Sequence, residues 1–132
     1  MMLRNKTIMG AILISTAVLM LAGCYKDKTI VFDTGAEITR SVTFSGDITP
    51  ILNKSCNASG CHAQGGIKPD LSSANAFNSL TIGNYVNTTA AESSSLYLWM
   101  TGKKGAPMPT SGVNKDYNAL VLAWIKQGAQ NN

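Results

Sequence analysis

From about residue 41 onward the sequence predicts a small all-α domain of three to four helices, and two observations support this prediction. Apolar side chains recur at intervals of three and four residues in several segments, as they do on the buried face of a helix. Between these segments the chain is rich in glycine, proline and asparagine, which favour turns and loops. The one β-prone run, residues 29–32, lies ahead of this domain.

The first residues have the pattern of a secretory signal. Arg4 and Lys6 precede an apolar run over residues 8–22, which is short for a helix that spans a membrane. The run ends in Leu-Ala-Gly-Cys24, which resembles the lipobox of bacterial lipoproteins. That resemblance implies a signal peptide over residues 1–23, cleavage before Cys24, and acylation of Cys24, for example with palmitate. The alternative is an uncleaved membrane anchor.

Either alternative ties the rest of the chain to a membrane, outside the cytoplasm. Tyr25 follows Cys24, where many inner-membrane lipoproteins have an aspartate, so we expect the outer membrane, facing the periplasm or the cell surface. Residues 24–40 are mostly polar and are expected to tether the domain, which would then span residues 41–132. The alternative is that this stretch belongs to the packed fold.

The composition without the signal limits the partners and the size of the core. Nine basic and seven acidic residues remain, an excess of two positive charges that is too small to indicate binding of nucleic acid. A domain of roughly a hundred residues is at the low end for a self-sufficient core. Such a domain usually needs a covalent or metal staple.

The first predicted helix of the domain begins at Ser45 or Asp47, either of which can cap it, and has Pro50 in its first turn. Its apolar face consists of Ile48, Ile51 and Leu52. The helix delivers the chain to Cys56.

Cys56 and Cys61 are followed directly by His62, the only histidine of the chain. Two cysteines followed at once by histidine are the attachment signature of c-type haem. Each thiol bonds to one vinyl group of the porphyrin, and the imidazole can then reach the iron. The usual signature has two residues between the cysteines and this chain has four, so the extra pair must loop out, which Asn57, Ser59 and Gly60 allow.

The cysteine count leaves two alternatives to haem. With Cys24 assigned to lipid, Cys56 and Cys61 are the remaining thiols, and in an oxidising compartment they would not stay free. A disulfide between them would close a very small loop, which stabilises a fold little. A zinc site would need a fourth ligand beyond these two and His62.

Three further helices are expected, separated by loops. The first two span residues 74–80 and 90–100. The last begins behind Asn114 or Asp116 and stops at Gly128, where glycine can adopt left-handed backbone.

Residues 101–109 form the second informative loop. Met108 stands between Pro107 and Pro109, and prolines on both sides fix the direction of the backbone. The order of an early Cys-Cys-His and a late Met-Pro is similar to that of class I cytochromes c. By this resemblance, Met108 is the sixth ligand of the haem iron, on the side opposite His62.

The same resemblance implies a small cytochrome c-like fold around one covalent haem c, with the first and last helices crossing. The residues then expected to contact haem are Ile51, Leu52, Pro69, Trp99 and Pro107. In small cytochromes a proline carbonyl after the histidine often orients the imidazole. Pro69 therefore either holds His62 in the required tautomer or only ends the loop.

We therefore expect a membrane-anchored c-type cytochrome of the bacterial envelope that exchanges single electrons with redox partner proteins and is not an enzyme. If Met108 does not bind the iron, the open position would suit a haem enzyme or a gas sensor. If Cys56 and Cys61 form a disulfide, the chain would be a lipoprotein without haem.

Overall fold

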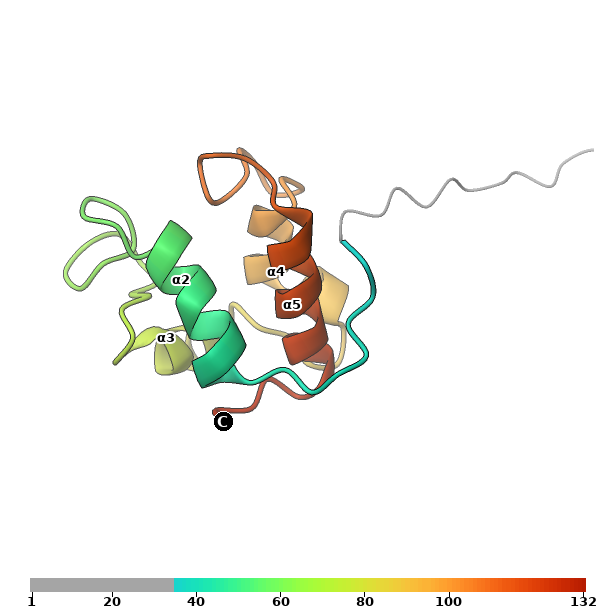
Figure 1. Cartoon of the computed structure of the whole chain (residues 1–132). Coiled ribbons are helices and arrows are strands. Elements are labelled where there is room, and N and C mark those ends of the chain that lie inside the picture. Colours follow the sequence, from blue (N-terminus) through green and yellow to red (C-terminus); the bar gives the residue numbers. More distant parts are fainter. Residues whose placement is uncertain (1–34) are drawn as a thin grey trace, which may run out of the picture. The chain divides into compact units, whose positions relative to one another are not determined.

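The computed structural model describes residues 35–132, and within that range the chain is helical without a β-strand (Figure 1). In chain order the helical elements are the π-helix η1 (Phe44–Ile48), α2 (Thr49–Ser55), α3 (Ala76–Ile82), the 3₁₀ helix η2 (Ala91–Ser93), α4 (Ser95–Met100) and α5 (Lys115–Lys126). The predicted all-α class is confirmed. The predicted signal peptide, Cys24 and the first part of the predicted tether lie outside the described residues.

The first helical segment is capped by Thr43, which precedes both of the predicted capping residues. Thr43 Oγ1 accepts the N–H of Gly46 (3.2 Å), and the Asp47 carboxylate accepts the N–H of Thr43 (2.8 Å). The predicted cap at Ser45 or Asp47 is wrong, because Asp47 lies inside the helix and bonds back to the capping residue. Pro50 is in the first turn of α2, as expected, and the wide π-turn precedes it. Proline lacks an N–H and crowds the carbonyl four residues earlier, which disfavours a regular α-turn there.

The stretch expected to be one helix over residues 90–100 is divided into η2 and α4. Ser94 separates them with φ −57° and ψ 131°, which is extended backbone. Its side chain is buried, and its Oγ accepts the N–H of Asn87 (2.9 Å). This hydrogen bond to the backbone seven residues earlier competes with the helical pattern and interrupts it.

Helix α5 agrees with the prediction at both ends. Asn114 Oδ1 accepts the N–H groups of Asp116 (3.1 Å) and Tyr117 (3.0 Å), so Asn114 is the N-cap. Gly128 ends the helix with φ +96°. The helix contacts η1, η2 and α4, so these three elements pack around it.

Phe44 of η1 joins the two sides of the core. Its ring centroid lies 5.3 Å from that of Phe77 in α3, in an edge-on arrangement, and 5.3 Å from that of Trp124 in α5. Ile48 and Leu52 belong to the same buried cluster. The first helical segment therefore packs against α5 mainly through η1.

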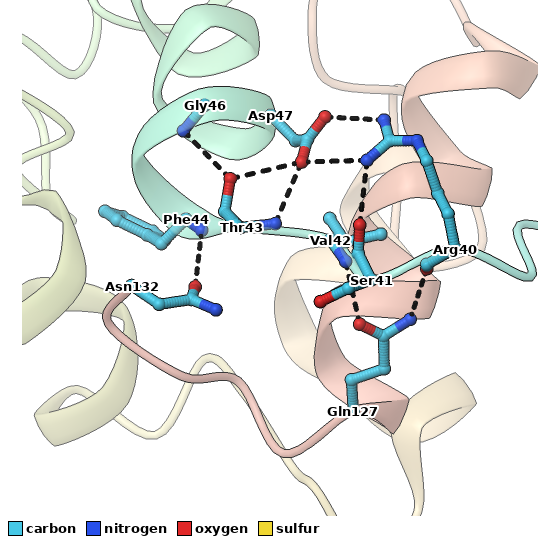
Figure 2. A network of polar contacts seen from close by, with 9 residues as sticks. All are labelled: Arg40, Ser41, Val42, Thr43, Phe44, Gly46, Asp47, Gln127 and Asn132. Atoms are coloured by element: carbon cyan, nitrogen blue, oxygen red, sulfur yellow. Dashed lines mark hydrogen bonds and ion pairs between the residues drawn. The ribbon is translucent and has the colours of Figure 1, made fainter.

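A polar network ties the residues before η1 to α5 and to the end of the chain (Figure 2). Gln127 Oε1 accepts the N–H of Val42, and its Nε2 donates to the carbonyl of Arg40, both at 2.9 Å. Asn132 accepts hydrogen bonds from the first two N–H groups of η1. Residues 35–40, the described part of the predicted tether, therefore lead into a segment that is hydrogen-bonded to Gln127 at the end of α5 and to Asn132. No helix in the described part of the chain is long and apolar enough to cross a membrane.

Candidate functional site

Helix α2 carries two of the predicted haem contacts and ends directly before Cys56. Ile51 and Leu52 are both buried, and Leu52 is part of the core cluster. The N–H groups of Cys56 and Asn57 both donate to the carbonyl of Leu52, at 2.9 and 2.8 Å. The end of the helix is therefore closed by the first residues of the loop, which fixes Cys56 relative to the core.

The residues between the two cysteines form a compact turn. The N–H of Cys61 donates to the carbonyl of Ala58 (2.9 Å), and Gly60 has φ +81° within this turn. The N–H of His62 then donates back to the carbonyl of Cys56 (3.2 Å). The extra residues of the motif are thus taken up in a hydrogen-bonded turn, and Cys56 and His62 are brought close in spite of them.

The two thiols of this loop are free and differ in their surroundings. Cys56 is half-buried and Cys61 is exposed, and no disulfide joins them. Burial of its sulfur, followed by the proximity of the Cys61 thiol, raises the pKa of Cys56 to about 11. Cys56 is therefore protonated at neutral pH, whereas a thiol at the exposed position is open to reagents.

His62 is held through one ring nitrogen. Its Nδ1 lies 3.0 Å from the carbonyl oxygen of Ile67 and 3.1 Å from that of Pro69. Carbonyl oxygens only accept hydrogen bonds, so Nδ1 carries the proton of the neutral ring. The lone pair is then on Nε2, the nitrogen that a metal would bind. The sequence left two alternatives for Pro69, and the contact of its carbonyl with the His62 ring agrees with the one in which it orients the imidazole. The contact of Ile67 had no sequence signal, because any residue supplies a carbonyl.

The loop after His62 is closed by backbone hydrogen bonds. The N–H of Ile67 donates to the carbonyl of Cys61 (2.8 Å), and the N–H of Leu71 donates to that of His62 (2.7 Å). Gly66 is required by this closure, since a Cβ there would collide with the carbonyl oxygen of Cys61. The loop is therefore hydrogen-bonded to the cysteine motif at two points, through Ile67 near its middle and through Leu71 at its end.

Asp70 anchors the far end of the same loop. It is buried, and its carboxylate accepts hydrogen bonds from the hydroxyl and N–H of Ser72 (2.6 and 3.0 Å) and from the amide of Asn75 (2.9 Å). These hydrogen bonds, with those of Ser72 first, lower the pKa of Asp70. Asp70 therefore has a structural role, which is to hold the end of the loop directly after Pro69.

Met108 lies in the loop between α4 and α5 and is half-buried, as are its neighbours Pro107 and Pro109. The N–H of Met108 donates to the carbonyl of Trp99 at the end of α4 (3.0 Å). Pro107 approaches Gly102, where a Cβ would lie 3.6 Å from Pro107 Cβ. Three of the predicted site residues, Trp99, Pro107 and Met108, are therefore gathered in one loop and its supporting helix.

The predicted site residues thus form two groups. One is the cysteine motif with Pro69, attached to the end of α2, and the other is the loop of Met108. Both loops lie at the same end of α2 and α5, the upper end in Figure 1. Among residues 35–132 no three His, Cys, Asp or Glu side chains are grouped so that they could hold a metal ion by themselves.

The donor set of the first group is suited to covalent haem. Two free thiols, one of them exposed, lie on either side of a single turn, and the imidazole that follows has its Nε2 available. This chemistry agrees with the order in which haem would be held, by two sulfurs and then by a nitrogen on the iron.

Comparisons with models of protein families, with curated proteins and with solved structures find no match to this chain.

Proposed function

We propose that this chain is a monohaem c-type cytochrome that transfers single electrons in the bacterial envelope. Haem c would be bonded to Cys56 and Cys61, with His62 as the proximal ligand and Met108 as the ligand on the other side. When bound, haem supplies a one-electron couple at its iron. The observation that carries the proposal is the pair of hydrogen-bond acceptors at His62 Nδ1, which leaves Nε2 for a metal.

Each residue has a separate task in this proposal. The carbonyls of Ile67 and Pro69 hold the imidazole in one orientation, which reduces the cost of ordering it on binding. Ile51 and Leu52 bring apolar surface to the end of the helix that delivers Cys56, and apolar surroundings exclude water from a bound ring. A thioether ligand from Met108 would raise the redox potential relative to ligation by two histidines.

Cys24 would attach the protein to the membrane through lipid, outside the described residues. Several acyl chains on one residue give a stable anchor, where a single chain is marginal. The electron donor and acceptor would then be redox proteins that reach this membrane surface.

The decisive experiment is production of the full chain in a host with functional haem-attachment machinery, followed by a pyridine haemochrome spectrum. We expect the spectrum of thioether-linked haem and a mass that includes one haem. Cys56→Ala and Cys61→Ala should each lose one thioether, and His62→Ala should abolish normal ligation. Ser59→Ala, an exposed residue of the same turn, is the matched control and should retain haem.

A colourless, iron-free product from the competent host would refute this function. Carbon monoxide binding to the reduced protein separates electron transfer from the enzyme or sensor alternative. A carrier with Met108 on the iron should bind it poorly, whereas an open position would bind it readily.

A further inference from the structure

The loop that carries Met108 is bound to the end of α4 through two carbonyl groups. The carbonyl of Trp99 accepts the N–H of Gly102 (3.2 Å) and that of Met108 (3.0 Å), so it closes the loop at both ends. The carbonyl of Leu98 accepts the N–H of Lys103 (2.9 Å) and that of the residue after it (3.2 Å). These hydrogen bonds set the position of the Met108 backbone relative to α4.

The side chain of Trp99 fixes the middle of the same loop. A Cβ built on Gly105 would lie 2.7 Å from Cζ3 and 3.1 Å from Cη2 of the Trp99 ring. Contacts closer than 3.0 Å are essentially never made by real Cβ atoms, so only glycine lets the backbone approach the ring this closely. Trp99 therefore touches the loop through its ring and holds its ends through its carbonyl.

We propose that Trp99, with Gly105 seated on its ring, is a positioning residue for Met108. This inference rests on the proposed function, because it assigns Trp99 to the presentation of the thioether to iron. A loop held in one conformation before the ligand bond forms does not have to be ordered by that bond. If the loop opens, Met108 moves away and the sixth position of the iron becomes accessible.

The sequence predicted Trp99 as a haem contact, and the geometry adds a different role. A haem contact would act directly, through the Trp99 ring against the bound haem. A positioning residue acts through the loop, so a change at Gly105, which is exposed, should disturb Met108 without touching the His62 side.

The test combines Gly105→Ala with two further variants. Gly105→Ala forces the loop off the Trp99 ring, and overpacking of this kind should speed amide hydrogen exchange at Met108 roughly tenfold. Gly112→Ala is the matched control for backbone strain, because its φ of +113° also disfavours a side chain while its Cβ meets no atom within 4 Å. Trp99→Leu removes the ring and keeps the carbonyl. In the double variant of Trp99→Leu with Gly105→Ala, the added methyl group should therefore have little further effect on amide exchange at Met108.

Two readouts are taken, and one does not depend on haem. The first is amide exchange at Met108 in the purified chain. The second is the weak far-red absorption band of methionine-ligated iron, with the midpoint potential, in haem-loaded protein. We expect Gly105→Ala to speed exchange, weaken the band and lower the potential, while Gly112→Ala changes all three clearly less.

Each contrary result has a definite meaning. Unchanged exchange in Gly105→Ala, or an equal change in Gly112→Ala, overturns the role of Trp99. Faster exchange with an unchanged band and potential also overturns it, because the loop would then move without affecting the ligand. Wild-type protein with attached haem but no methionine band overturns this inference and the ligation by Met108, and leaves the covalent attachment of haem standing. A wild type without haem overturns the proposed function as well, and the haemochrome spectrum identifies that case. If Gly105→Ala does not fold, Trp99→Leu tests the same contact by removing it.

Discussion

Replacement of Asp47 by asparagine should remove a pH-dependent part of the stability. The Asp47 carboxylate accepts two hydrogen bonds from the guanidinium of Arg40, at 2.6 and 3.1 Å, and one from the N–H of Thr43 (Figure 2). These hydrogen bonds, with that of Arg40 first, lower the pKa of Asp47 from 3.8 to about 2. Asparagine keeps an acceptor for Thr43 and loses the ion pair.

The magnitude follows from the change in pKa and the exposure of the pair. Lowering the pKa from 3.8 to about 2 would correspond in full to about 2.4 kcal/mol. The Arg40 side chain is 57% exposed and that of Asp47 17%, so solvent screening reduces this to roughly 1–2 kcal/mol. For a domain of this size the change in melting temperature at neutral pH would be about 4–16 °C.

The direction of the pKa change determines how the stability contribution of Asp47 depends on pH. Because the pKa is lower in the folded chain, the carboxylate stabilises the fold above about pH 4, and this contribution is lost as the pH falls towards 2. The difference in unfolding free energy between wild type and Asp47→Asn should therefore shrink to near zero over that interval. Urea unfolding at several pH values measures the difference directly, and other titrating groups cancel from it.

Glu92→Gln is the matched control for Asp47→Asn. The ion pair of Glu92 with Lys126 (2.7 Å) has both side chains more than half exposed, so its loss should change stability much less. A difference between wild type and Asp47→Asn that stays constant from pH 6 to pH 2 would show that Asp47 acts through its shape and not through its charge.

Three other changes test the core, the loop after the histidine and the lipid anchor. Phe44→Ala should cost about 3–5 kcal/mol in urea unfolding, because Phe44 is 4% exposed and packs on two aromatic rings, and a loss below 1 kcal/mol would contradict this packing. Gly66→Ala should lower the melting temperature and the yield of attached haem, because its Cβ would meet the carbonyl of Cys61, whereas Gln64→Ala, at an exposed position of the same loop, should leave both close to wild type. Cys24→Ala should abolish incorporation of labelled palmitate and release the protein from membranes, and retention of the label would contradict lipidation at this residue.

The ends of α5 could be predicted because they depend on local chemistry. Asn114 caps with its own side chain, and Gly128 adopts φ +96°, which few other residues tolerate. The start of η1 could not be predicted in the same way. Thr43 is held by a carboxylate one turn later, and the first N–H groups of η1 bond to Asn132 at the far end of the chain. Ser94 divides a helical pattern because its hydroxyl bonds to the backbone of Asn87, seven residues earlier and outside the helical pattern.

The cysteine motif and Pro69 could be identified from spacing and residue type, and the structure gives their hydrogen bonds. The turn that absorbs the extra residues of the motif was expected over Asn57, Ser59 and Gly60, and Gly60 takes the left-handed backbone there, with φ +81°. The relation between Trp99 and Gly105 was not visible, because a tryptophan at helical spacing predicts only a buried face. The close approach of a glycine to its ring requires the path of the loop to be known.

Both residues that the proposed function needs most are held by backbone carbonyls, His62 through its ring and Met108 through its backbone. His62 is oriented through Nδ1 and Met108 through its own N–H, and any residue type supplies a carbonyl. The sequence marks such close approaches only indirectly, at glycines where a Cβ would collide: at Gly66 with the carbonyl oxygen of Cys61, and at Gly105 with the ring of Trp99. Ile67 illustrates the converse, because its side chain is 63% exposed while its carbonyl bonds to the imidazole. Replacing the Ile67 side chain by alanine should therefore leave the orientation of His62 intact, although a methyl group added at Gly66 next to it should not.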